Sequence, residues 1–165
     1  MVARAQLNNA EGRPAGSVSL RQADEGLAVR VRASGLEPGF HGFHVHESGV
    51  CDPKARAEGK PMPFASAGPH LSRGGSPHGE HAGDLPPILV GADGTASANV
   101  VVRSFSVDEL TADDATAFIV HADPDNLANI PDRYAVDGEG GPDAETLETG
   151  DSANRVACGK VARTG

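Results

Sequence analysis

The regular alternation of apolar and polar residues is the feature of this sequence that most limits the folds open to it. Short apolar or alternating runs recur along the chain and are typical of buried or half-buried β-strands. We expect strands at residues 2–7, 17–20, 27–32, 40–46, 88–90, 96–102, 117–121 and 155–161. A chain of short strands without a sustained helical period is predicted to be all-β.

Two long stretches interrupt these strands. Residues 51–87 and 122–154 show no sustained periodicity and hold most of the 12 prolines. Loops of this length in a compact domain are usually functional. Ser106 and Glu109 have the spacing of a capping box, which predicts one helical turn through Leu110. Residues 1–165 are thus predicted to form one domain, an eight-stranded β-sandwich or barrel with two long functional loops.

The charge of the chain limits the classes of partner that it can bind. The net charge of −9 argues against nucleic acid or an anionic membrane as partner. No apolar run approaches the roughly 18 residues that a transmembrane helix needs. The first residues also lack the basic and apolar regions of a secretory signal.

The two cysteines, Cys51 and Cys158, lie far apart in the sequence. Their number alone fits one long-range disulfide, and equally fits two buried free thiols. A disulfide would imply an oxidising compartment. A mature exported domain (periplasmic, cell-envelope or secreted), with its leader removed, reconciles these observations.

Six of the seven histidines form a pattern that indicates a metal site. His44 and His46 are two residues apart on an expected strand, so that both rings leave the same face. His121 ends another strand. The first long loop contributes a second group with the spacing H-x7-H-x2-H-x2-D, consisting of His70, His78, His81 and Asp84. Imidazoles with a single carboxylate suit copper and zinc. The seventh, His41, is expected to be structural.

Several segments resemble the copper,zinc superoxide dismutases. They are Gly42–Glu47 (GFHVHE), Ser66–His70 (SAGPH), His81–Leu85 (HAGDL), Val120–His121 and Arg155–Gly159 (RVACG). The resemblance extends over nearly the whole chain, and the short interval between His46 and Cys51 is similar to the bacterial branch. It implies a Greek-key arrangement of the eight strands.

The resemblance also implies the metals and their ligands. Copper would be bound by His44, His46, His70 and His121. Zinc would be bound by His70, His78, His81 and Asp84, so that His70 bridges the two metals.

Further roles follow from the same resemblance. Arg155 would hold superoxide, the anionic substrate, beside copper, and His70 would also pass a proton to the peroxide product. Asp125 would accept hydrogen bonds from His44 and His78. Cys51 and Cys158 would form an intrasubunit disulfide. The implied activity is dismutation of superoxide to dioxygen and hydrogen peroxide, and the family allows a homodimer.

Two features depart from the family pattern. Only Gly79 and Glu80 separate His78 from His81, which keeps open a copper-only dismutase with an empty zinc site, and Glu80 as a competing ligand. A non-catalytic copper-binding module is a further alternative, although it would not need Arg155. The second long loop has nine acidic residues and one basic residue. Its charge predicts that superoxide is repelled at long range and held only locally by Arg155.

Overall fold

The computed structural model describes residues 1–131, 134–136 and 139–165. Its main element is an eight-stranded sheet in which all neighbouring strands are antiparallel. Across the sheet the order is β7 (Asp84–Val90), β4 (Gly39–His46), β9 (Ala117–His121), β12 (Arg155–Arg163), β1 (Ala3–Asn9), β2 (Pro14–Ala23), β3 (Gly26–Ser34) and β8 (Thr95–Val102). The eight predicted strands and the all-β class are confirmed.

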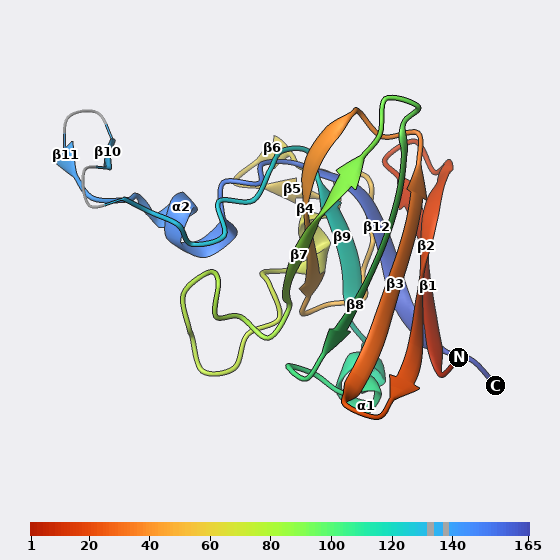
Figure 1. Ribbon diagram of the computed structural model, residues 1–165. Helices are drawn as coiled ribbons and strands as arrows, with labels where there is room; N and C mark the ends of the chain where they lie inside the picture. The colour runs from red at the N-terminus through yellow and green to blue at the C-terminus, as the bar shows by residue number, and fades with distance from the viewer. Residues whose placement is uncertain (132–133, 137–138) are drawn as a thin grey trace.

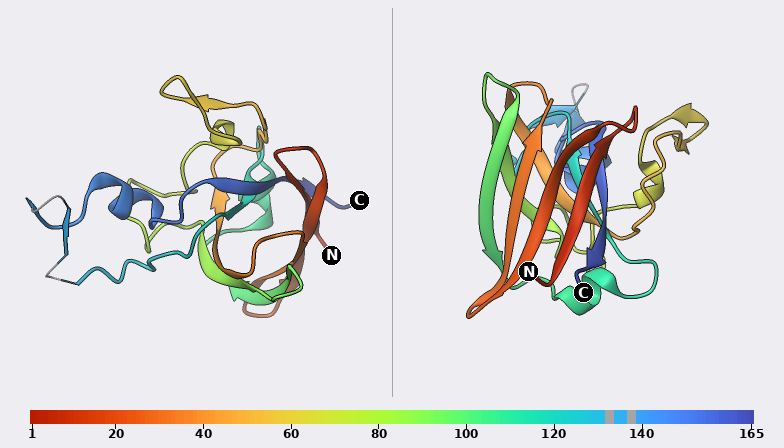
Figure 2. Two further views of the ribbon diagram at one scale, coloured as in Figure 1. Left: turned by 90° about the horizontal axis from the view of Figure 1, so that it is seen from above. Right: turned by 90° about the vertical axis from the view of Figure 1, so that its right-hand side faces the viewer.

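The sheet curls until its edge strands β7 and β8 lie side by side, which gives a barrel (Figure 2, left). The connections from β3 to β4 and from β8 to β9 cross from one side of the barrel to the other. This is the expected Greek-key pattern.

The alternation in the sequence decides which side chains fill the barrel. In β3, Leu27, Val29 and Val31 are buried, whereas Arg30 and Arg32 are exposed. Inside the barrel the rings of Phe43 and Phe118 stack with their centroids 5.5 Å apart. Each such buried side chain contributes on the order of 2 kcal/mol to folding. The barrel therefore gives the loops a rigid support.

Outside the barrel, α1 (Val107–Thr111) begins with the predicted capping box of Ser106 and Glu109. The remaining short elements were not expected from the sequence. They are β5 (Arg56–Ala57), β6 (Lys60–Pro61) and the 3-10 helix η1 (Ala65–Ala67) in the first long loop, and β10 (Ala135–Val136), β11 (Glu139–Gly140) and α2 (Ala144–Thr149) in the second. Elements this short carry no periodic signal.

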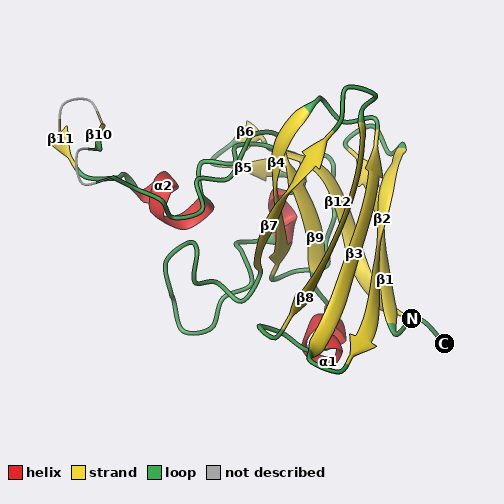
Figure 3. Ribbon diagram, viewed as in Figure 1, coloured by secondary structure: helices red, strands yellow, loops and turns green. Residues whose placement is uncertain are grey.

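Both long loops leave the barrel on the side of β4, β7 and β9 (Figures 1 and 3). Cys51 and Cys158 form a disulfide that ties the first loop to β12, so the predicted pairing is confirmed. The second loop carries α2, β10 and β11 away from the barrel (Figure 1). Among the described residues, no helix has the length and apolar character needed to cross a membrane.

Candidate metal centre

The first group of ligand atoms lies where β4 and β9 meet the first loop. Antiparallel pairing of β4 with β9 brings His121 toward His44 and His46. A bridge between His46 and His70 holds the loop residue against the same strand. One ligand atom from each of these four buried histidines lies within 4.8 Å of the others. The structure thus brings together all four residues predicted to bind copper.

In each of these four rings, one nitrogen contacts a protein acceptor; for His70 this is Nδ1, 2.9 Å from the Asp84 carboxylate. Nδ1 of His46 donates to the Gly68 carbonyl at 2.8 Å, and Nδ1 of His121 donates to the Ala153 carbonyl at 3.1 Å. Nε2 of His44 donates to Asp125 at 2.5 Å. Because each neutral ring donates its one N–H to such an acceptor, its other nitrogen keeps a lone pair, which is directed into the centre.

Those remaining nitrogens fit a bound cation. The Nε2 atoms of His46 and His121 face each other at 3.3 Å. Nδ1 of His44 and Nδ1 of His78 are buried and have no hydrogen-bond partner among the described residues. An unpartnered buried polar atom is costly. Imidazole nitrogens converging in this way are the donors that copper and zinc prefer, so the residues fit these metals.

The second group consists of His70, His78, His81 and Asp84, and its ligand atoms also lie within 4.8 Å of one another. Asp84 is at its centre: the carboxylate lies 2.9 Å from Nδ1 of His70, 3.4 Å from Nδ1 of His78 and 3.2 Å from Nδ1 of His81. The two-residue interval between His78 and His81 therefore still permits both rings to face one carboxylate. Glu80 is exposed and lies outside the group.

Asp125 connects the two groups. Its Oδ2 accepts from Nε2 of His44, and its Oδ1 accepts from Nε2 of His78 at 2.8 Å and from the backbone N–H of Leu127 at 2.7 Å. Burial favours the protonated acid, but the hydrogen bonds from His44 and His78 outweigh it and hold the Asp125 pKa below its usual value. The carboxylate thus fixes one ring of each predicted metal site, as the sequence analysis expected.

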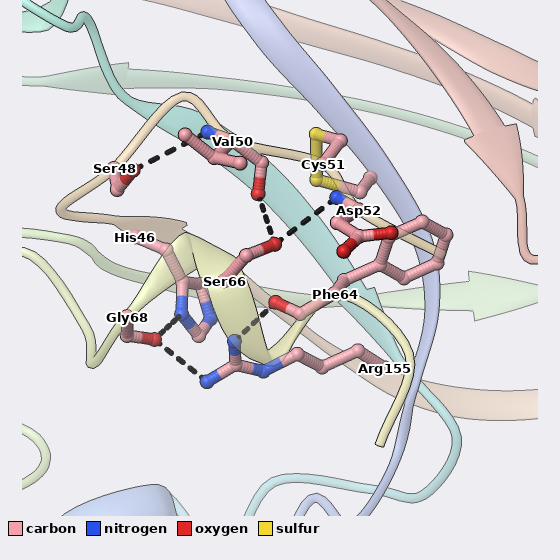
Figure 4. Close-up of a disulfide and its surroundings, with 10 residues drawn as sticks. His46, Ser48, Val50, Cys51, Asp52, Phe64, Ser66, Gly68 and Arg155 are labelled. Atoms are coloured by element: carbon pink, nitrogen blue, oxygen red, sulfur yellow. Dashed lines mark hydrogen bonds between the residues drawn. A yellow bond between two sulfur atoms is a disulfide. The ribbon is translucent and has the colours of Figure 1, made fainter. Parts of the chain in front are cut away.

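Arg155 is held by the backbone of the first loop (Figure 4). Its Nη1 donates to the Phe64 carbonyl and its Nη2 to the Gly68 carbonyl, each at 2.6 Å. The Gly68 carbonyl also accepts from His46, so one peptide oxygen contacts both the arginine and a predicted copper ligand. Sequence reasoning missed these contacts because a backbone carbonyl leaves no mark in the residue type.

A cavity of about 390 Å³ opens beside the histidines. His70, His121 and Arg155 line it together with Glu145 and Glu148, the two glutamates of α2. Arg155 thus shares this cavity with two of the predicted copper ligands. No signal in the sequence marks these two glutamates as site residues, because only the position of α2 places them at the cavity.

Glycine is required where loop backbone meets ligand rings. A Cβ atom on Gly150 would lie 2.2 Å from Nε2 of His78, and its φ of +69° disfavours other residues. A Cβ atom on Gly42 would lie 2.6 Å from Cβ of Ser152 and 3.1 Å from Cε1 of His44. Both positions let the second loop pack directly over the histidines.

His41 lies outside the ligand groups, as expected of a structural histidine. It is buried, with Nδ1 at 2.6 Å from the His121 carbonyl and Nε2 at 2.8 Å from the Glu37 carbonyl. The ring thus ties the turn before β4 to the end of β9.

When no metal is bound, burial and neighbouring charges shift the pKa values of the histidines in the centre. Burial lowers the pKa of His70 to about 4. Burial would also lower the pKa of His78, but the hydrogen bond to Asp125 and the nearby Asp84 carboxylate prevail and raise it to about 9. Burial, followed by the charge of Arg155, lowers the pKa of His46. In the metal-free protein, neighbouring rings thus prefer different protonation states.

These shifts predict that the metal-free protein is most stable near pH 6.5. His70 has a lowered folded pKa, so it reduces the free energy of unfolding as the pH falls below its unfolded pKa of about 6.5 toward its folded pKa. His78 has a raised folded pKa, so its contribution is complete below about 6.5 and is lost as the pH rises toward 9. Urea unfolding of chelator-treated protein at several pH values measures this, and a profile that rises or falls steadily would contradict it.

Comparison with known proteins identifies the family. Residues 14–161 match the family model described as copper/zinc superoxide dismutase (SODC). A superoxide dismutase [Cu-Zn] of Mycobacterium tuberculosis is 45% identical over 130 residues, which cover 76% of this chain and 54% of the relative. The chain thus spans about half the length of this mycobacterial relative. A superoxide dismutase [Cu-Zn] 2 of Brassica juncea is 36% identical, with 98% of this chain and 97% of the relative covered.

Comparison with solved structures points to the same family. The Cu/Zn superoxide dismutase from Brucella abortus superposes with a TM-score of 0.72 and 29% identity over 96% of this chain and 98% of that one. A SOD-like protein from Bacillus subtilis gives 0.68 and 29% identity over 94% and 95%. These matches cover the barrel and both long loops. The chain belongs to the copper/zinc superoxide dismutase family.

Proposed function

We propose that this chain is a superoxide dismutase that binds copper and zinc and converts two superoxide anions and two protons into dioxygen and hydrogen peroxide. The observation that carries the proposal is that His70 belongs to both ligand groups and lines one cavity with Arg155. When bound, copper supplies one-electron redox chemistry, and zinc holds the shared imidazole. His44, His46, His70 and His121 would hold copper, and His70, His78, His81 and Asp84 would hold zinc.

Arg155 binds and orients the anion. Its carbonyl contacts use one N–H of Nη1 and one of Nη2, which fixes the guanidinium plane and leaves further N–H groups for the substrate. A guanidinium keeps its charge at all physiological pH values, so it attracts superoxide and donates hydrogen bonds to it. Its place in the cavity wall also argues against a module that only stores copper.

His70 is the group suited to move a proton. Its Nδ1 faces Asp84, so its Nε2 is the nitrogen on the opposite side of the ring, toward His44, His46 and His121. That nitrogen can hold a proton and release it into the cavity while Nδ1 keeps its own contacts. Asp125 keeps the rings of His44 and His78 in place during the cycle.

The copper-only alternative has no observation in its favour. The four predicted zinc ligands converge despite the short interval between His78 and His81. We expect purified protein to hold one copper and one zinc per chain and to consume superoxide. Metal analysis beside an activity assay tests this. Protein that fills with copper but never takes up stoichiometric zinc would refute the bridged site and leave the copper-only enzyme.

The acidic cavity wall leads to a prediction about salt. Glu145 and Glu148 line the same cavity as Arg155, so they repel an approaching anion when screening is weak. The Debye length is about 30 Å at 0.01 M and about 8 Å at 0.15 M ionic strength. Added salt removes the long-range repulsion but leaves the contact with Arg155. The second-order rate, measured by pulse radiolysis, is therefore expected to stay level or rise over this range.

Matched variants isolate the cause. E145Q/E148Q is expected to raise the rate at low salt, whereas D24N/E25Q, on the exposed turn between β2 and β3, removes the same charge far from the cavity and serves as control. Arg155→Gln is expected to lower the rate at both salt levels. A several-fold fall in the wild-type rate with added salt would overturn the prediction, because it would mean that attraction dominates.

We also propose that the protein works in an oxidising compartment outside the cytoplasm, in the periplasm, the cell envelope or secreted. The Cys51–Cys158 disulfide supports this, because such bonds persist where thiols are not kept reduced. A homodimer stays a prediction. Phe40 and Leu89, paired between β4 and β7 and each more than half exposed, offer apolar surface for it.

A further inference from the structure

Four arginines share the outer face of the barrel, on the strands that Figure 2 (right) shows from the front. The side chains of Arg4, Arg21, Arg30 and Arg32 are exposed, and within the described residues they make no hydrogen bond or ion pair. The other described arginines are all engaged. Carboxylates pair with Arg13, Arg73, Arg103 and Arg163, and backbone carbonyls accept from Arg56 and Arg155.

No acidic residue lies on the strands of this surface, which we name the arginine face. β1, β2, β3 and β8 contain its four arginines and neither aspartate nor glutamate, although the chain as a whole carries −9. The acidic second loop projects from the opposite side of the barrel (Figure 1). At about 0.15 M salt its field is screened over such distances. The arginine face is therefore locally cationic on an anionic protein.

Strand register arranges these side chains in a row. Arg4 pairs with Ser19, Ser19 with Arg30, and Arg30 with Asn99, so charged and neutral polar groups alternate across four strands. Neighbouring strands are about 4.8 Å apart, which puts successive cations about 10 Å apart. A hollow of about 380 Å³ lies along this row, lined in part by Ser17, Arg21 and Arg32.

The composition of the face selects among anionic partners. The four strands carry no aromatic residue on which a nucleic-acid base could stack. Val101 is their only exposed large apolar side chain, which is too little to anchor a membrane-surface protein. Guanidinium groups match carboxylates in shape and charge, and serine and asparagine side chains match sugar hydroxyls.

We propose that the arginine face binds an acidic polysaccharide in which charged and neutral sugars alternate. The carboxylates would contact Arg4 and Arg30, and the neutral sugars would lie over Ser19 and Asn99. The bound chain would follow the row across the strands, with Arg21 and Arg32 at the hollow beside it. The proposal does not depend on the metal centre, which lies under the loops on another side of the barrel.

Binding to immobilised hyaluronan, whose uronate and neutral amino sugar alternate, tests the proposal. Wild-type protein is expected to bind at about 0.15 M ionic strength, where the field of the acidic loop is screened. It is expected to bind more weakly at about 1 M, where the Debye length falls to about 3 Å and the contacts with the arginines are screened as well. R4Q/R30Q is expected to bind at least about tenfold more weakly, since each variant residue removes a charge-assisted contact. R56Q/R73Q removes the same charge from two engaged, exposed arginines of the first long loop and is expected to bind within about twofold of wild type.

Other outcomes would overturn the proposal. They are no binding, equal losses in both double variants, or several-fold tighter binding of polygalacturonate, in which every sugar is charged. Tighter binding of anionic lipid vesicles or single-stranded DNA would reassign the face to those partners. Thermal unfolding of each variant shows whether the fold is kept. If R4Q/R30Q unfolds early, Arg30→Lys replaces it: this variant keeps the charge but loses bidentate contact, and is expected to weaken binding.

Discussion

Replacing Cys51 and Cys158 together by alanine is expected to lower the free energy of unfolding by about 4–5 kcal/mol. The disulfide joins residues 107 positions apart, so it closes a loop that includes most of the chain and restricts the unfolded state strongly. Urea unfolding of the double variant and of wild type, both metal-free, measures the difference. Reduced wild type serves as the matched control and should unfold like the variant.

The same variant is expected to weaken the hold on Arg155. Phe64 packs in a small buried cluster with Cys158, and the Phe64 carbonyl accepts from the arginine. Loss of the crosslink frees that loop segment, so superoxide turnover should fall even under conditions where the variant is folded. Two alkylatable thiols in native, non-reduced protein, or an unchanged free energy of unfolding, would contradict the assigned role of the disulfide.

Asp125→Asn is expected to weaken the retention of both metals by about 10- to 100-fold. The carboxylate accepts from His44 with one oxygen and from His78 with the other. An amide of the same shape offers one oxygen and one NH2 group, so one of the two imidazole N–H groups would meet a donor instead of an acceptor. The affected ring loses its orientation and its electrostatic support, which weakens its metal.

Competition with a chelator at neutral pH measures the effect for each metal separately. Asp123→Asn is the matched control, because it removes the same charge from an exposed side chain two residues earlier. Its metal retention is expected to stay near wild type. Unchanged retention in Asp125→Asn, or an equal loss in the control, would show that Asp125 does not position the ligands.

The barrel was predictable because its signal is local. Alternating burial in β3 follows directly from the period of the sequence. β7 was predicted only from Ile88 onward, whereas it begins at Asp84, because Pro86 and Pro87 obscure a strand that pairing with Phe43 and His44 holds in place. The histidines were equally visible, since their type and spacing alone indicate metal chemistry.

The rest of the site depends on contacts between distant segments. Nothing in the sequence around Glu145 and Glu148 shows that α2 faces Arg155 and His121. The backbone oxygens that fix Arg155 belong to residues whose side chains carry no such chemistry. Such contacts arise only when the loops fold over the barrel.

The carbonyl of Gly68 has a consequence for redesigning this protein. Because one oxygen accepts from both His46 and Arg155, a shift of that single peptide alters both the ring of a proposed copper ligand and the plane of the guanidinium that we propose binds the substrate. Substitutions selected at positions 64–68 would therefore change metal affinity and anion affinity together. Independent tuning of anion affinity would have to come from other residues that line the cavity, such as Glu145 and Glu148 of α2, which belong to neither ligand group.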